Sequence, residues 1–293
     1  MESRPLGRTG LSVSPIGLGC VTFGREIDEA MSFAVLDRAR ECGITLIDTA
    51  AAYHQGASER VIGAWLADRG GRDGMIIATK VAVPLTRERV IASAEESLRR
   101  LRVEAIDLFQ LHSWDPATPV EETLEALAVL QQAGKIRHAG CSNWTLDHLR
   151  ATSGMATLQP PYNLVQREIE HGIIDHCFKA GIGILSYSPL AAGFLTGKYR
   201  PDGVVPAGTR FDVIPGHQPI YFTERGWRVV EQLRALAART GRPMADLALG
   251  WVIGRRGVTS VLIGARHPGQ VDQAIAAAGD PLADEWVEEM SRW

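Results

Sequence analysis

Three titratable residues recur at an equal spacing in the first half of the chain. Asp48, Lys80 and His112 each end a short run rich in Ile, Leu and Val, and each lies 32 residues after the one before. One strand–helix unit has about 30 residues and returns each strand end to the same rim of a parallel sheet. Tyr53 lies five residues beyond Asp48, close enough to fold back over that rim. We therefore expect these four side chains to converge.

Together, these four residue types suit the reduction of a carbonyl group. A tyrosine is a poor acid at neutral pH unless a cation stabilises its phenolate, and Lys80 can supply that cation while Asp48 holds Lys80 in place. A neutral His112 can donate a hydrogen bond to the carbonyl oxygen and orient it. Because no side chain can deliver a hydride, this chemistry implies a nicotinamide cofactor.

The sequence has no intact glycine-rich fingerprint of a Rossmann dinucleotide-binding fold. Residues 17–19 read Gly-Leu-Gly, but Thr22 stands where the third glycine belongs. Residues 181–183 fail in the same way, with Ser186 in the third place. A nicotinamide site must therefore be built from loops at the ends of other strands.

The elements expected to position these residues alternate between strands and helices. Eight apolar runs are expected to be strands: residues 16–19, 45–47, 75–79, 106–111, 136–141, 158–159, 183–187 and 259–263. Helical spacing follows most of them, as over residues 58–66, after a capping Thr86 and before a capping Gly134. Strands that alternate with helices pair in parallel, and eight of them close into a (β/α)8 TIM barrel.

Three segments lie outside this repeat. Residues 6–13 alternate around a Thr-Gly turn, which predicts an N-terminal β-hairpin that plugs the bottom of the barrel. Residues 194–226 predict a long loop, and long loops in compact domains are usually functional. Residues 284–293 predict an extra C-terminal helix. The length of 293 residues alone would suggest about two domains. No linker divides the chain, however, so we expect residues 1–293 to form a single domain.

Composition narrows the possible partners. The chain is 45% hydrophobic and 22% charged, with a formal net charge of −3 and a pI of about 6.3, which argues against nucleic acid or an anionic membrane surface. We expect neither a secretory signal nor a membrane span. The four cysteines form no Cys-x-x-Cys pair and the histidines no His-Glu-x-x-His motif, so we expect reduced thiols, a cytoplasmic protein and no metal.

Several longer motifs contain or follow the residues at the strand ends. They are Leu46-Ile47-Asp48-Thr49-Ala50 with Tyr53, Ala78-Thr79-Lys80, Leu111-His112, Gly140-Cys141-Ser142-Asn143, Gln159-Pro160-Pro161-Tyr162-Asn163-Leu164, Tyr187-Ser188-Pro189-Leu190-Ala191-Ala192-Gly193 and Gly197-Lys198-Tyr199. Together they resemble the motifs of the aldo-keto reductases. The resemblance runs from the N-terminal hairpin to about Ala276. It implies that Tyr53 donates the proton, that Lys80 and Asp48 tune it, and that His112 orients the carbonyl.

The resemblance also implies where a cofactor lies. From the nicotinamide ribose to the adenosine end, the implied residues are Gly19, Cys20, Val21, Asp48, Ser142, Asn143, Gln159, Tyr187, Ser188, Leu190, Gly193, Ile263, Gly264, Arg266 and Gln270. Tyr187 would stack under the nicotinamide ring. Arg266 suits a 2′-phosphate, which favours NADP(H) over NAD(H). At Ala274 the chain departs from the many relatives that carry an adenine-contacting asparagine there.

The substrate is less well defined than the cofactor. Phe23, His54, His112 and Trp114, with the loop over residues 194–226, are expected to form the pocket wall. A sugar or another hydroxylated carbonyl would suit these residues, and simple aldehydes are equally compatible. Two alternatives stay open. One is a cofactor-binding regulatory subunit similar to potassium-channel β subunits, and the other is an enzyme that oxidises a sugar or alcohol. The oligomeric state is not predicted.

Overall fold

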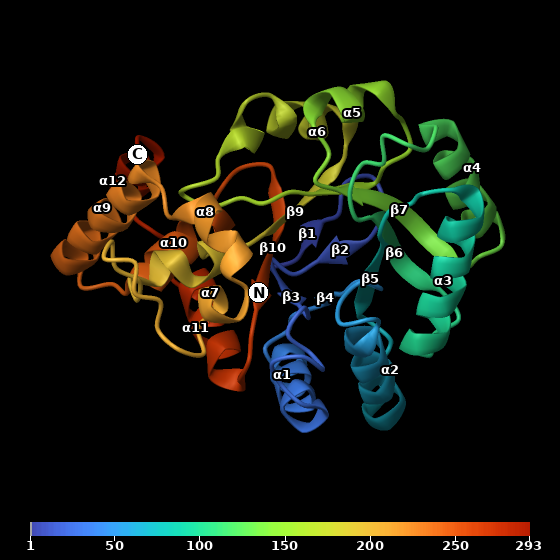
Figure 1. The fold of residues 1–293 in the computed structure, drawn as a ribbon, viewed down its shortest axis with the longest axis horizontal. Coiled ribbons are helices and arrows are strands. Elements are labelled where there is room, and N and C mark those ends of the chain that lie inside the picture. Colours follow the sequence, from blue (N-terminus) through green and yellow to red (C-terminus); the bar gives the residue numbers. More distant parts are fainter. Residues whose placement is uncertain (1) are drawn as a thin grey trace.

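The computed structural model describes residues 2–293, and its centre is a closed barrel of eight parallel strands (Figure 1). The strands are β3 (Ile16–Gly19), β4 (Leu46–Asp48), β5 (Ile76–Val81), β6 (Ile106–Leu111), β7 (Ile136–Ser142), β8 (Thr157–Gln159), β9 (Gly183–Tyr187) and β10 (Val258–Gly264). They pair in chain order, and β10 closes the barrel against β3. All eight predicted strands and the parallel barrel are thus confirmed.

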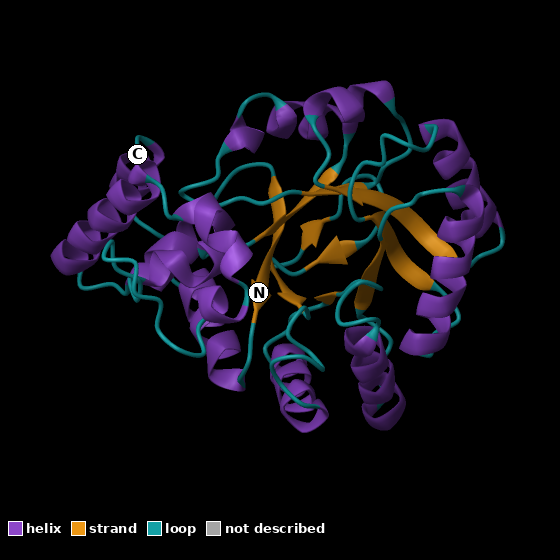
Figure 2. Cartoon of the chain, viewed as in Figure 1, coloured by secondary structure: helices purple, strands orange, loops and turns teal. Residues whose placement is uncertain are grey.

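Helices form a ring around the strands (Figure 2). They are α1 (Glu29–Glu41), α2 (Ala57–Arg69), α3 (Arg87–Leu101), α4 (Val120–Gln132), α5 (Leu146–Ala151), α6 (Ile173–Ala180), α9 (Glu224–Thr240), α10 (Met244–Ile253), α11 (Pro268–Gly279) and the C-terminal α12 (Asp284–Ser291). Thr86 caps α3 as expected, accepting a hydrogen bond from the Arg89 amide. The C-cap of α4 is Ala133, and Gly134 follows it with a φ of +69°. Over residues 2–293, no helix combines the length and the apolar character that a membrane crossing needs.

An N-terminal hairpin closes one end of the barrel. Its strands are β1 (Arg4–Pro5) and β2 (Ser12–Val13), which pair antiparallel. Leu6 and Val13 from this hairpin are fully buried against inward-facing strand residues, namely Leu46, Ile76, Ala78, Leu108, Leu185 and Leu262. Leu46 and Ile76 begin their strands, and Arg4 of the hairpin donates a hydrogen bond to the carbonyl of Val258, the first residue of β10. The hairpin therefore plugs the N-terminal end of the barrel and leaves the opposite rim open.

The segment over residues 194–226 is more ordered than the predicted loop. It contains short helical turns: η2 (Ala191–Thr196), α7 (Arg210–Val213), η3 (Pro215–His217) and α8 (Gln218–Tyr221). Its aromatic rings pack on one another with centroids 4.7–6.4 Å apart; they belong to Phe194, Tyr199, Phe211, Tyr221, Phe222 and, from α9, Trp227. The segment thus carries its own small core, and for this reason it folds into turns instead of an open loop.

Candidate active site

The carboxyl ends of three neighbouring strands bring the four predicted side chains together. Lys80 on β5 donates hydrogen bonds to Asp48 Oδ2 at 2.6 Å and to the Thr49 carbonyl at 2.8 Å. Its Nζ also lies 3.4 Å from Tyr53 Oη, and the Tyr53 ring meets the His112 ring edge-on at 5.9 Å between centroids. Lys80 is fully buried and Asp48 nearly so, and Asp48, Tyr53 and His112 line a cavity.

Burial and charge set the protonation of this group. Burial raises the pKa of Tyr53, and the nearby Lys80 ammonium partly opposes that rise. Burial would lower the pKa of Lys80, but the charge of Asp48 and the contact with Tyr53 outweigh it, so this pKa is raised and the ammonium persists. Burial, with the Lys80 charge adding to it, lowers the pKa of His112 to about 4. At pH 7 His112 is therefore a neutral imidazole.

Two glutamines complete the surroundings of Asp48. Gln159 Nε2 donates to Asp48 Oδ1 at 2.8 Å, and Gln110 Nε2 approaches the same oxygen at 3.3 Å. The backbone carbonyl of Gln159 in turn accepts a hydrogen bond from Ser142 Oγ at 2.7 Å. Both oxygens of this buried carboxylate thus have donors, as the charge requires.

Asn143 links the cavity wall to His112. Its φ is +60°, and Nδ2 donates to the His112 carbonyl at 3.0 Å. The Tyr187 hydroxyl donates to Asn143 Oδ1 at 2.8 Å, which fixes the edge of the Tyr187 ring. Asn and Asp tolerate this left-handed backbone better than other side chains, so Asn143 suits the position at the end of β7.

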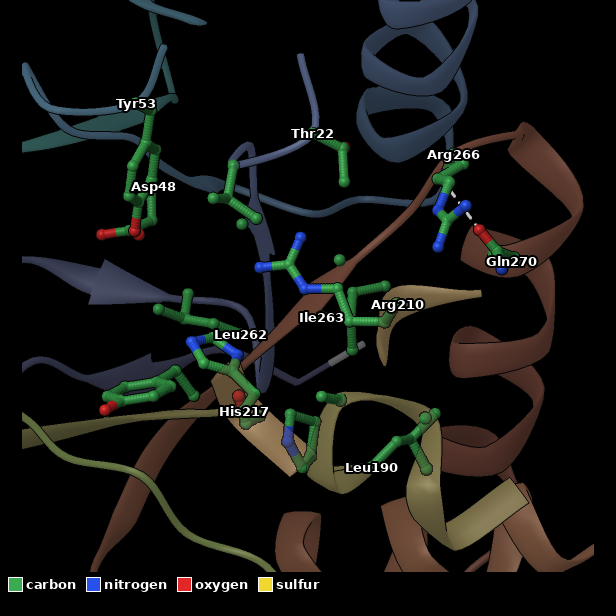
Figure 3. A pocket seen from close by; sticks show the side chains of 18 of the residues that line it. Thr22, Asp48, Tyr53, Leu190, Arg210, His217, Leu262, Ile263, Arg266 and Gln270 are labelled. Atoms are coloured by element: carbon green, nitrogen blue, oxygen red, sulfur yellow. Dashed lines mark hydrogen bonds between the residues drawn. The ribbon is translucent and has the colours of Figure 1, made fainter. Parts of the chain in front are cut away.

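A cavity of about 520 Å3 runs along the open rim (Figure 3). Asp48 and Tyr53 lie at one end of the view, and Arg266 and Gln270 lie at the other, where Gln270 Oε1 accepts from the Arg266 amide at 2.7 Å. The predicted cofactor residues that line it are Gly19, Val21, Asp48, Ser142, Asn143, Gln159, Tyr187, Ser188, Leu190, Gly193, Ile263, Gly264, Arg266 and Gln270. Cys20 does not line the cavity; it is fully buried and its thiol contacts the Leu18 carbonyl.

Sequence reasoning missed two cations on the cavity wall. Lys198 and Arg210 line the cavity with Arg266. Arg210 pairs with Glu26 at 2.9 Å, and Arg266 donates to the Gly208 carbonyl at 2.8 Å. Burial and the neighbouring Arg266 charge both lower the pKa of Lys198. A bound anion would relieve this mutual repulsion, so the three cations mark a place for phosphate groups. The Gly197-Lys198-Tyr199 motif contains one of them, but nothing in the sequence indicates that Lys198 and Arg210 reach the cavity that Arg266 lines.

Of the four residues predicted to contact substrate, only His112 lines this cavity. His112 lines it, but Phe23 is fully buried in the core and leaves no surface for a substrate. His54 is exposed in a turn with a φ of +46°. Trp114 stacks on His148 with ring centroids 4.0 Å apart and meets Trp144 edge-on. We therefore leave Phe23 out of the substrate wall, whereas contacts from His54 and Trp114 stay predictions.

The donors along the cavity suit a nicotinamide dinucleotide. Ser142, Asn143 and Gln159 offer amide and hydroxyl groups at the Tyr53 end, beside the flat ring of Tyr187. The segment over residues 188–193 also lines the cavity, and Ser188, Ala191, Ala192 and Gly193 in it all have positive φ. Arg266 lies at the end of the view away from Tyr53, and Arg210 lies between the two (Figure 3), as the phosphates of such a cofactor require.

Comparisons with known proteins agree with this geometry. The family model described as "Aldo/keto reductase family" matches residues 15–292. The chain is 36% identical to the aldo-keto reductase YhdN of Bacillus subtilis (strain 168), over 97% of this chain and 91% of that protein. Among solved structures, the glycerol dehydrogenase of Gluconobacter oxydans superposes with a TM-score of 0.84 at 30% identity, covering 99% of this chain and 94% of that chain. An aldo-keto reductase of Bacillus halodurans in its holo form also has a TM-score of 0.84, at 28% identity over 100% of this chain and 96% of that one.

Proposed function

The chain belongs to the aldo/keto reductase family, and from that premise we propose that it reduces an aldehyde or ketone to the alcohol with NADPH. One observation carries the proposal. The Tyr53 hydroxyl lies 3.4 Å from a buried lysine ammonium at one end of a long cavity that offers both amides and cations. A weak acid held beside a fixed cation is the arrangement that protonates a carbonyl oxygen as negative charge develops on it.

The residues divide the reaction between them. When bound, a nicotinamide supplies the hydride that no side chain can provide. Neutral His112 donates a hydrogen bond to the carbonyl oxygen and holds it near the Tyr53 hydroxyl. Tyr53 then gives its proton to that oxygen, and the ammonium of Lys80 stabilises the phenolate left behind. Asp48 keeps Lys80 in position and compensates its buried charge.

We further propose that the cofactor is NADP(H). Ser142, Asn143 and Gln159 would hold the carboxamide, and Tyr187 would support the ring face. Arg266 would take the 2′-phosphate, since its guanidinium lies at the end of the cavity opposite Tyr53 and can pair bidentately with phosphate (Figure 3). A hydroxylated carbonyl such as a sugar aldehyde is the substrate class that we would test first, with simple aldehydes beside it.

The test is the Tyr53→Phe variant, followed by the loss of NADPH absorbance with a panel of sugar aldehydes, keto-sugars and simple aldehydes. We expect wild type to turn over at least one carbonyl and Tyr53→Phe to lose at least about 100-fold in kcat, since general acids contribute roughly that much or more. Tyr199→Phe is the matched control, because the buried Tyr199 hydroxyl has no hydrogen-bond partner in residues 2–293. Full activity in Tyr53→Phe would rule out the assigned mechanism.

The reverse direction is a second candidate function. The similarity to a glycerol dehydrogenase, at 30% identity over 99% of this chain, favours it. Oxidation would use the same residues, with the Tyr53 phenolate accepting the alcohol proton. A higher kcat/KM for a polyol with NADP+ than for the corresponding carbonyl with NADPH would favour this direction.

A further inference from the structure

Gln110 is a buried polar residue next to the active site for which the mechanism above gives no role. It lies on β6, directly opposite Lys80 of β5 in the strand register, and both side chains reach Asp48 from inside the barrel. Lys80 contacts Oδ2 of the carboxylate and Gln110 Nε2 lies 3.3 Å from Oδ1. Gln110 is fully buried. Its amide nitrogen must face the carboxylate, since the amide oxygen in that place would meet like charge.

The surroundings of Gln110 leave room for this contact and for little else. Gly140 lies opposite Gln110 in the register of β6 and β7, and a Cβ added there would lie 3.1 Å from Gln110 Cγ. Within residues 2–293, Oε1 of Gln110 has no hydrogen-bond partner. A fully buried glutamine with an unpaired oxygen is costly, whereas leucine or methionine would fill the same space without that cost. The hydrogen bond to Asp48 is therefore the one advantage that glutamine has over an apolar residue at position 110.

Under the proposed function, Gln159 serves both Asp48 and the ligand. Its side-chain amide donates to Asp48 Oδ1 at 2.8 Å and also lines the cavity where the cofactor carboxamide would bind. An amide that turns toward a ligand weakens its bond to the carboxylate. Gln110 does not line the cavity, so its contact with Asp48 is independent of the ligand.

We propose that Gln110 is a positioning residue for the proton donor. Its amide holds the carboxylate of Asp48, and through it the ammonium of Lys80, under the Tyr53 hydroxyl while the cofactor is bound. This inference rests on the proposed carbonyl reduction. It predicts that Gln110 affects kcat without contacting cofactor, substrate or the reacting atoms.

The first test is Gln110→Met, which keeps the volume and removes the donor. We expect kcat to fall about tenfold, the range of one hydrogen bond to a charged group, with the KM for the carbonyl and the binding of NADPH by protein fluorescence unchanged. Thr157→Val is the matched control, because Thr157 is fully buried at the same level of the barrel, opposite Gly140, and its hydroxyl has no partner in the described chain. Wild-type kcat in Gln110→Met, or an equal loss in Thr157→Val, would overturn the proposal.

The second test is Gln110→Glu, whose readout is the pH profile. Burial and the charge of Asp48 raise the pKa of the introduced carboxyl, and the nearby Lys80 ammonium opposes that rise. At low pH the carboxyl is protonated and still donates to Asp48. As pH rises through that pKa, two carboxylates face each other, and we expect a loss of kcat that wild type lacks. A wild-type profile in this variant would overturn the inference even if Gln110→Met failed to fold. If the Gln110 inference fails in this way, the proposed function still holds as long as wild type is active and Tyr53→Phe is inactive.

Discussion

Removing Lys80 should affect both the stability of the fold and the activity of Tyr53, and a second substitution can separate these two effects. Lys80→Met keeps most of the side-chain volume but leaves Asp48, only 2% exposed, without its cation, and the Thr49 carbonyl without its donor. Removing one partner of a buried ion pair costs about 3–5 kcal/mol. A free-energy loss of 1 kcal/mol lowers the unfolding midpoint by roughly 2–4 °C in a chain slightly smaller than this one, so we expect the midpoint to fall by about 10 °C.

The double variant Asp48→Asn/Lys80→Met shows whether unpaired charge is the cause. With both charges removed, the amide at position 48 can still accept hydrogen bonds from Gln110 and Gln159. We expect urea unfolding to show that most of the lost stability returns, because replacing both partners of a buried pair is often nearly neutral. NADPH-dependent activity should stay absent, since Tyr53 then has no cation beside it. The reasoning is refuted if Lys80→Met unfolds within about 1 kcal/mol of wild type, or if the double variant is no more stable than the single one.

Three further variants test other parts of the site. His112 has a pKa near 4 in the folded chain against 6.5 unfolded. The neutral His112 therefore contributes about 3 kcal/mol to the free energy of unfolding above pH 6.5, and this contribution is lost as pH falls toward 4. In urea unfolding, the stability of His112→Gln should fall less on acidification than that of wild type. Equal losses in the two proteins would contradict this. Arg266→Met should weaken NADPH binding about 10- to 100-fold and leave NADH binding unchanged, with the exposed Arg256→Met as control, whereas equal losses for both cofactors would exclude a 2′-phosphate role. Gly140→Ala would place a Cβ 2.2 Å from Thr157 Oγ1 and should cost about 1–3 kcal/mol in chemical denaturation. Adding Thr157→Ala should restore much of that loss, and a wild-type midpoint in Gly140→Ala would show that the barrel relaxes freely.

The barrel could be predicted because each strand and its rim residue are local signals. Asp48, Lys80 and His112 follow apolar runs at a spacing of one strand–helix unit, and a closed parallel barrel turns that spacing into proximity. The hairpin plug and the C-terminal helix were readable for the same reason. That residues 1–293 form a single domain stays a prediction.

Contacts between distant segments could not be predicted in this way. Gln110 and Gln159 are 62 and 111 residues from Asp48, and neither spacing nor residue type indicates that both amides reach the same oxygen. Phe23 shows that a residue predicted at the site can instead be buried in the core. An aromatic residue near the first strand end suited a substrate wall, but the chain folds it into the core.

The sequence by itself determined the fold class, and it predicted the four residues of the proposed proton-donating group and a cofactor site outside a Rossmann fold. Only the tertiary structure decided what surrounds that group. It set Lys80 between Asp48 and Tyr53, and it carried Arg210 on the long loop to the cavity that Arg266 also lines. The reason is physical. Strand periodicity is written in neighbouring residues, whereas the charge, burial and hydrogen bonding of a side chain depend on groups brought to it by chain closure.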